Sequence, residues 1–182
     1  MNAQFQREKA IAAMGHVVQQ TQASMYSVMK MMYLADKLHL ERYGRFIAGD
    51  TYAAMKQGPV PSHAYNLVKC VRGESESCPG DVVAREFFAY GADDHSLKLL
   101  RDPDLDELSE SDIRCLDVVI ETYKKMGHWA VRDMSHDDAW KAAWKSARRK
   151  SFPMSVEAIA GQLEGAERLV AHLRDNAPGR AN

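Results

Sequence analysis

The segment from Met29 to Tyr65 restricts the possible fold of this chain more than any other. It begins with a long apolar stretch, MKMMYLADKLHL, that reads as a helix, and it continues into a dense loop that ends in GPVP at residues 58–61. Because each proline ring fixes one φ angle, most of the backbone at this end of the loop is restricted. We therefore expect the loop to hold one particular surface or junction in place.

The helix that leads into this loop is predicted over residues 24–43, with Thr21 or Ser24 as its N-cap and Gly44 as the glycine that ends it. Its apolar residues cover two faces: Met25, Val28, Met29, Met32 and Ala35 lie on one, and Met31, Leu34 and Leu38 on the other. Such wide coverage is typical of a helix that is buried on several sides. We expect this helix to form the centre of the fold.

The rest of the chain reads as further helices with a small β part. Helices are predicted over 5–20, from Ser62 to about Cys70, from Ser109 through Tyr123, over 129–134 and 137–148, and over about 155–174. Ser62, Ser109 and Ser155 are the predicted caps, with Asp112 completing a capping box. Residues 46–55 are consistent with a short extended piece, and residues 82–100 with a β-hairpin around GADDHS. We expect one mainly α globular domain over 1–182, with its core in about 10–150 and a small antiparallel β-hairpin or sheet.

Charge is balanced overall but uneven along the chain. The formal net charge is −1, yet six carboxylates and no base lie between Asp102 and Asp112, and five bases and no acid lie between Lys141 and Lys150. Two solvated faces are the simpler explanation, and a basic patch for a charged partner is the sharper alternative.

Cysteine usage and hydropathy indicate the compartment. Cys70, Cys78 and Cys115 are odd in number and form no CxxC pair, which fits a reducing compartment better than a disulfide framework. The N-terminus lacks the apolar stretch of a signal peptide, and no run approaches the ~20 apolar residues of a membrane span. We expect a cytoplasmic protein with no membrane partner.

No pattern of catalytic or cofactor-binding residues stands out. The histidines are scattered, and His136 with Asp137 and Asp138 lacks a second His or Cys at ligand spacing. The chain has no GxSxG motif, and the prolines of the GPVP loop remove the N–H groups that would bind phosphate. We expect no enzyme activity, no metal and no cofactor.

Two kinds of binding surface are left to weigh. The basic segment 137–150 carries Trp140 and Trp144, whose i,i+4 spacing favours anchoring to the core, so nucleic acid is not an expected partner. At the loop, aromatic and methionine side chains stand beside rigid prolines, and a preorganised apolar surface loses little entropy on binding. Packing of the loop onto its own domain is the simpler alternative, and on the residues alone it is somewhat the stronger.

The run MKMMYLADKLHLERYGRFIAGDTYAAMKQGPVPSHAY resembles the signature of the Panacea domain, the SocA-like antitoxin family. The matching positions are Lys30, Tyr33, Leu34, Ala35, Asp36, His39, Leu40, Tyr43, Gly44, Gly49, Asp50, Tyr52, Ala54, Met55, Lys56, Gly58, Pro59, Val60 and Pro61. A weaker likeness covers LSESD at 108–112 and the residues around His136 and Trp140, so that the resemblance spans roughly residues 10–145.

The resemblance implies an antitoxin that neutralises a cognate protein toxin by forming a complex with it. It also implies one alternative, an adaptor that delivers the toxin to a ClpXP-type protease. A prophage-linked transcriptional regulator that uses the basic segment 137–150 is the other alternative left open. A role in phage defence fits the same family, and a homo-oligomer is left open. The family carries over no catalytic residues.

Within the matching segment we expect two groups of residues. Those expected to meet the partner are Tyr43, Phe46, Asp50, Tyr52, Met55, Lys56, Gly58, Pro59, Pro61 and His63. Those expected to support the structure are Tyr33, Asp36, His39, His136 and Trp140, with Asp36 as an internal cap for the loop, because a buried carboxylate needs hydrogen-bond donors.

Overall fold

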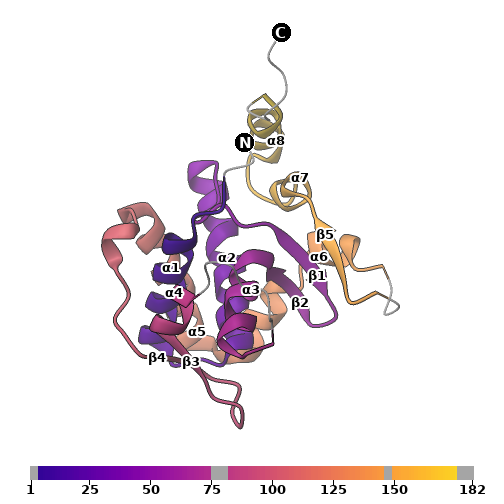
Figure 1. The fold of residues 1–182 in the computed structure, drawn as a ribbon. Coiled ribbons are helices and arrows are strands. Elements are labelled where there is room, and N and C mark those ends of the chain that lie inside the picture. The colour runs from indigo at the N-terminus through magenta and orange to yellow at the C-terminus, as the bar shows by residue number, and fades with distance from the viewer. Residues whose placement is uncertain (1–3, 75–81, 146–148, 176–182) are drawn as a thin grey trace.

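The computed structural model describes residues 4–74, 82–145 and 149–175. Helix α2 (Met25–Tyr43) runs through the middle of the molecule, as Figure 1 shows. It begins at Ser24, whose side chain accepts a hydrogen bond from the backbone N–H of Ser27, and it ends at Gly44, whose φ is 72°. Every residue over 27–36 is buried. The prediction of a central helix over 24–43 is confirmed.

Two long helices pack against α2. Helix α1 (Arg7–Thr21) contacts both α2 and α5 (Glu110–Ser135), and α5 lies along α2 for much of its length. The predicted capping box is present, with the Ser109 side chain bonded to the backbone of Asp112 and the Asp112 side chain bonded to the backbone of Ser109. Gly127, with φ of 79°, interrupts the helical conformation inside α5, so the separate helix predicted over 129–134 is the last part of α5.

A three-stranded antiparallel sheet lies beside α2, in the order β2-β1-β5. Strands β1 (Tyr52–Met55) and β2 (Gly58–Pro61) form a tight hairpin in which Tyr52 pairs with Pro61, and β1 also pairs with β5 (Ser151–Met154). The extended piece predicted within 46–55 is therefore confirmed, whereas β5 was not predicted. Its sequence SFPM is short and contains a proline, which suits an edge strand but gives no alternating pattern.

Helix α3 (Ser62–Val71) follows β2 directly and matches the predicted helix from Ser62 to Cys70. The prediction that Ser62 caps it is wrong, because Ser62 is its first residue and its N-cap position, Pro61, offers no side-chain hydrogen bond. The hairpin predicted over 82–100 is correct only in its middle. Residues Val82–Phe87 form helix α4, and the hairpin consists of β3 (Phe88–Tyr90) and β4 (Leu97–Leu99), followed by the 3₁₀ turn η1 (Leu105–Glu107).

The C-terminal region differs from the prediction in two places. The helix predicted over 137–148 ends early, as α6 (Asp138–Ala143), and residues 146–148 lie outside the described part. The single helix predicted over 155–174 is two helices, α7 (Val156–Ala160), capped by Ser155 as predicted, and α8 (Ala166–Asp175). Gly161 ends α7, and Gly165 has a φ of 69° just before α8. Helix α8 extends away from the body of the molecule (Figure 1).

The fold class is mainly α with small antiparallel sheets, as predicted. Within the described ranges, no helix combines the length and the apolar character that crossing a membrane requires. Cys115 is a free, buried thiol, but Cys70 is disulfide-bonded, so the expectation of reduced thiols is wrong for Cys70. Cys78 lies outside the described residues.

Candidate functional site

Asp36 ties the loop between α2 and β1 to the central helix. Its Oδ1 accepts a hydrogen bond from the backbone N–H of Ile47 at 2.7 Å, and its Oδ2 accepts one from the hydroxyl of Tyr52 at 2.6 Å. Burial disfavours the charged carboxylate more than these two neutral donors favour it, and it raises the pKa of Asp36 to about 7. Both oxygens of Asp36 thus accept hydrogen bonds from the segment that follows α2, which is the arrangement of an internal cap.

Asp50 performs the capping that Ser62 does not. Its Oδ1 accepts hydrogen bonds from the backbone N–H groups of Thr51 and His63, at 2.7 and 2.8 Å, and its Oδ2 accepts one from Ala64 at 2.8 Å. Burial raises the pKa of Asp50, while the three backbone donors act in the opposite direction. The carboxylate thus satisfies the first N–H groups of α3 from the far end of the loop.

A third buried carboxylate, Asp112, holds the loop from the side of α5. Lys9 Nζ lies 2.6 Å from Asp112 Oδ2, and His39 Nε2 and Arg45 Nη2 lie 3.0 and 3.1 Å from Asp112 Oδ1. Burial alone would raise the pKa of Asp112, but hydrogen bonds from His39, Lys9 and Ser109 outweigh it and hold the pKa well below its usual range. His39 Nδ1 also contacts the carbonyl of Arg45 at 2.9 Å, which joins the start of the loop to the cluster.

The β1–β2 hairpin is anchored by the residues around α6. Trp140 Nε1 donates to the carbonyl of Met55 at 2.9 Å, and the Trp140 ring stacks on His136 with centroids 4.2 Å apart. Gly58 has a φ of 106°, and a Cβ on it would come within 2.7 Å of the His136 ring and 2.9 Å of Lys30 Nζ. Only glycine fits this close approach without displacing both groups.

Tyr33 and Lys37 connect α2 to the same region. The Tyr33 hydroxyl donates to Asp137 Oδ2 at 2.8 Å, and Lys37 Nζ lies 2.6 Å from the same oxygen. Asp137 Oδ1 accepts a hydrogen bond from the backbone N–H of Trp140 and so caps α6. Tyr33, His136 and Trp140 therefore occupy supporting positions in the structure.

Lys30 is a buried amine of α2 that has no counter-charge among the described residues. Its side chain belongs to a residue that is only 1% exposed, yet Nζ meets a single hydrogen-bond acceptor among the described residues, the carbonyl of Pro59 at 2.6 Å. The Tyr26 ring lies 4.9 Å from Nζ. Burial lowers the pKa of Lys30 to about 7. The amine is thus held in place but not neutralised by a carboxylate.

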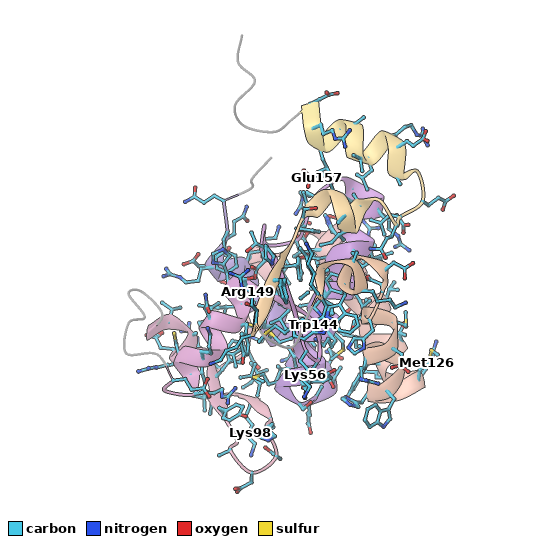
Figure 2. All side chains as sticks on the ribbon, turned by 90° about the vertical axis from the view of Figure 1, so that its right-hand side faces the viewer. Lys56, Lys98, Met126, Trp144, Arg149 and Glu157 are labelled. Carbon is cyan, nitrogen blue, oxygen red and sulfur yellow. The ribbon has the colours of Figure 1, made fainter. Side chains whose placement is uncertain are left out.

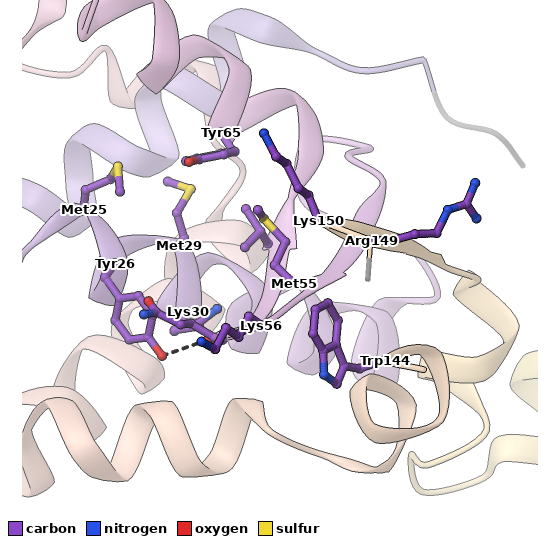
Figure 3. Close-up of a pocket in the computed structure, with 12 residues that line it drawn as sticks. Met25, Tyr26, Met29, Lys30, Met55, Lys56, Tyr65, Trp144, Arg149 and Lys150 are labelled. Atoms are coloured by element: carbon purple, nitrogen blue, oxygen red, sulfur yellow. Dashed lines mark hydrogen bonds between the residues drawn. The ribbon is translucent and has the colours of Figure 1, made fainter. Parts of the chain in front are cut away.

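Lys30 is one of the residues that line a pocket of about 430 Å³, which lies between α2, the β1–β2 hairpin, α3 and the segment after α6. The walls are largely apolar, and Figure 3 shows the methionines of α2 and β1 converging beside Tyr65 and Trp144. In the same view Lys150 extends toward Tyr65, whereas Arg149 points away. The lining residues are Met25, Tyr26, Met29, Lys30, Met55, Lys56, Gln57, Val60, Tyr65, Trp144, Arg149 and Lys150. This region is called the methionine pocket below.

The ten residues expected to meet a partner fall into three groups. Met55 and Lys56 line the methionine pocket. Three others lie outside the pocket lining: Tyr43, at the end of α2, is exposed; His63, in α3, is exposed and stacks on Phe5; and Phe46, in the loop, is half-buried with its edge against Tyr52. The remaining five are buried, namely Asp50, Tyr52, Gly58, Pro59 and Pro61. These five support the surface rather than form it.

Most of the pocket wall was not expected from the sequence. The residues on α2 read as core because apolar side chains surround that helix, and Trp144 read as a core anchor. Tyr65 carries no motif beyond its apolar spacing. The basic run at 141–150 was the one available signal, and the structure uses its end, Arg149 and Lys150, at the pocket rather than on a basic helix.

His136 and Asp137 do not build a metal site. Across the residues that the structure describes, no group of three or more His, Cys, Asp or Glu side chains is arranged to hold an ion. Asp137 is already engaged by Tyr33 and Lys37, and the His136 ring stacks on Trp140.

Comparison with curated proteins and with solved structures found no significant match. The profile of one family, described as antitoxin SocA-like, Panacea domain, matches residues 28–141. The matched range contains both the motif of α2 with its loop and the weaker motif around Asp112, His136 and Trp140. It therefore includes all but the first turn of α2, the β1–β2 hairpin, α3 and α5, which carry the anchored loop and seven of the twelve residues that line the methionine pocket. The chain belongs to the SocA-like antitoxin family with the Panacea domain.

Proposed function

We propose that this protein is an antitoxin that neutralises a cognate protein toxin by binding it directly, and that the methionine pocket is where the toxin docks. Membership of the SocA-like family supports the antitoxin role. The pocket itself supports this docking site, because it is open, largely apolar and bordered by the exposed side chain of Lys56.

The construction of the pocket suits protein recognition. Its backbone is held on three sides by Asp50, Asp36 and Trp140, so little ordering entropy is lost when a partner binds. Its walls carry Met25, Met29 and Met55, whose unbranched side chains adjust to the shape of an incoming side chain. A rigid frame with adaptable walls is what a binding surface needs.

Co-expression with the adjacent gene tests the proposal. We expect that gene to arrest growth when expressed alone and to be harmless together with this protein. Lys56→Glu with Tyr65→Asp should abolish the protection while the protein still accumulates. Lys98→Glu is the matched control, since Lys98 is an exposed lysine on β4 outside the pocket lining. In Figure 2 Lys98 is labelled below Lys56, on a different hairpin.

Two results would contradict the proposal. If the adjacent gene is harmless alone, the antitoxin role fails, and if the pocket variant protects as well as Lys98→Glu, the location fails. The half-life of the toxin in the same cells separates two mechanisms, because a simple blocker leaves it unchanged and an adaptor for a protease shortens it.

A further inference from the structure

We infer that the methionine pocket recognises an acidic, apolar segment of the partner protein, with a partner carboxylate reaching Lys30 and apolar partner side chains filling the pocket. This inference rests on the proposed function and adds the chemistry of the segment that is bound.

The first argument is the unbalanced charge of the pocket. Its lining includes four basic residues, Lys30, Lys56, Arg149 and Lys150, and no acidic one among the residues described. Elsewhere in the core the chain neutralises buried cations itself, as Asp112 does for Lys9 at 2.6 Å. Lys30, Lys56 and Lys150 instead fit a partner that brings carboxylates, because complementary charge raises both the association rate and the specificity of a complex.

The second argument is the position of Lys30. An ammonium has three N–H donors, and Pro59 is the one hydrogen-bond acceptor that Nζ meets in the described part of the chain. Lys30 stands in an apolar wall, where a buried charge interacts strongly with an opposite one. A partner carboxylate would therefore supply the acceptor and the counter-charge that the described part of the chain does not.

Exposed aromatic and methionine side chains next to the pocket indicate how large the bound segment is. The apolar surface does not stop at the pocket: the Tyr26 ring lies 5.4 Å from the His128 ring, and that ring lies 4.7 Å from Trp129. Trp129 is 67% exposed and Met126 is 64% exposed, which is unusual for such large apolar side chains. A surface that continues along α5 suits an extended or helical polypeptide segment better than a small carboxylate confined to the pocket.

Protonation gives the proposal a readout of its own. The pKa of Lys30 is about 7 in the free protein, and a bound carboxylate would raise it. Binding is then coupled to proton uptake, so affinity should be highest below pH 7 and should fall as the pH rises through that value.

The test measures fluorescence anisotropy with a short labelled peptide of alternating Asp, Leu, Glu and Phe. A second peptide carries Asn and Gln in place of the acids, and a third carries Lys and Arg. We expect saturable binding of the acidic peptide, binding of the amide peptide weaker by about tenfold or more, and no binding of the basic one. Lys30→Met should reduce the preference for acid over amide, since Lys56 and Lys150 remain, and should remove the pH dependence. Lys56→Glu with Lys150→Glu, at two exposed positions that leave the fold intact, should weaken the acidic peptide even if Lys30→Met does not fold.

Other outcomes overturn the inference. Equal binding of the acidic and amide peptides, or an undiminished preference and pH dependence in Lys30→Met, would show that Lys30 does not bind a partner carboxylate. Binding of dodecanoate without binding of the acidic peptide would assign the pocket to small acyl anions, and self-association abolished by the same variants would assign it to a second copy of this chain. Protection by the protein in the growth test, with unchanged protection by the Lys56→Glu, Lys150→Glu variant, would refute this inference and leave the antitoxin role standing.

Discussion

Helix α2 carries a buried carboxylate, Asp36, and a buried amine, Lys30, and the two differ in how many hydrogen-bond partners they have. Asp36 and Lys30 are almost fully enclosed, and burial shifts both pKa values to about 7 from opposite directions. Asp36 receives a donor on each of its oxygens, both from the loop that it holds. Lys30 has one hydrogen-bond acceptor among the described residues and lines the methionine pocket, although it is itself buried.

This difference between Asp36 and Lys30 indicates that one side of α2 stabilises the fold and that the other side is suited to binding a partner. On the side of the anchored loop, the carboxylates of Asp36, Asp50 and Asp112 all have donors from the chain itself, so that side is complete. On the side of the methionine pocket the positive charge is left for something else to neutralise. Changes on the first side should therefore lower the free energy of unfolding, whereas changes on the second side should alter binding.

The largest effect is expected at Asp112. Asp112→Asn leaves Lys9 and His39 without their buried carboxylate, so we expect the free energy of unfolding to fall by about 3 kcal/mol. Urea denaturation followed by circular dichroism measures it. The matched control is Glu110→Gln, because the Glu110–Arg114 pair is exposed and should contribute less than about 0.5 kcal/mol. Equal losses in the two variants would show that the buried cluster does not hold the loop.

A smaller loss is expected when Asp36 keeps its place but loses one donor. Tyr52→Phe removes the hydroxyl that donates to Asp36 Oδ2, and an unsatisfied buried oxygen costs about 1–3 kcal/mol. The same denaturation experiment measures it against Tyr90→Phe, in which the lost hydroxyl contacts an exposed His95. A Tyr52→Phe protein as stable as the wild type would mean that Ile47 alone is enough to anchor the loop.

The pH dependence of stability should show the two shifted groups with opposite signs. Asp36 has a pKa of 3.8 when unfolded and about 7 when folded, so the folded state binds more protons between these values and the free energy of unfolding falls as the pH rises. Lys30 changes from 10.5 to about 7, so the folded state binds fewer protons there and the free energy of unfolding rises with pH above 7.

Each group can change the free energy of unfolding by on the order of 1 kcal/mol per pH unit within its own window. Denaturation at a series of pH values should show the fall flattened in Asp36→Asn and the rise flattened in Lys30→Met. Parallel profiles for the wild type and either variant would contradict the burial of that group's charge.

The smallest effect on stability is expected at the pocket rim. Lys56→Glu with Lys150→Glu changes two exposed side chains, so the free energy of unfolding should stay within about 0.5 kcal/mol of the wild type. Binding should nevertheless weaken strongly, because the charge that faces the partner is reversed. Thermal unfolding beside the growth test separates the two readouts. A variant that unfolds early would place these lysines in the stability of the fold instead.

Much of the frame was predictable because local chemistry determines it. Ser24 and Gly44 delimit α2, and Ser109 with Asp112 begins α5, and each signal lies within one turn of the helix end that it sets. Asp36 could be predicted as a cap because a carboxylate on a buried helix has to find donors. The helix breaks at Ala143 and Gly161, and the edge strand β5, depend on tertiary pairing that no local pattern reports.

The site was less predictable than the frame. Asp50 and Tyr52 looked like contact residues because polar and aromatic side chains in a loop suggest recognition, but the chain uses both to hold itself together. Lys30 and Met29 looked like scaffold because they lie on the apolar helix, but both line the pocket. The pocket forms where α2, the hairpin and the residues after α6 come together. These segments are far apart in the sequence, so no local pattern predicts that they are neighbours.

The affinity of this protein for the toxin encoded by the adjacent gene decides whether the methionine pocket is the docking site. Titration calorimetry should compare the wild-type protein, the Lys56→Glu, Lys150→Glu variant and the Lys98→Glu control at one salt concentration. We expect the control to bind like the wild type and the pocket variant to bind more weakly by about a hundredfold, since the loss of opposed charges at an interface costs about 2–5 kcal/mol. Equal dissociation constants for all three proteins would contradict the claim that the methionine pocket is the docking site.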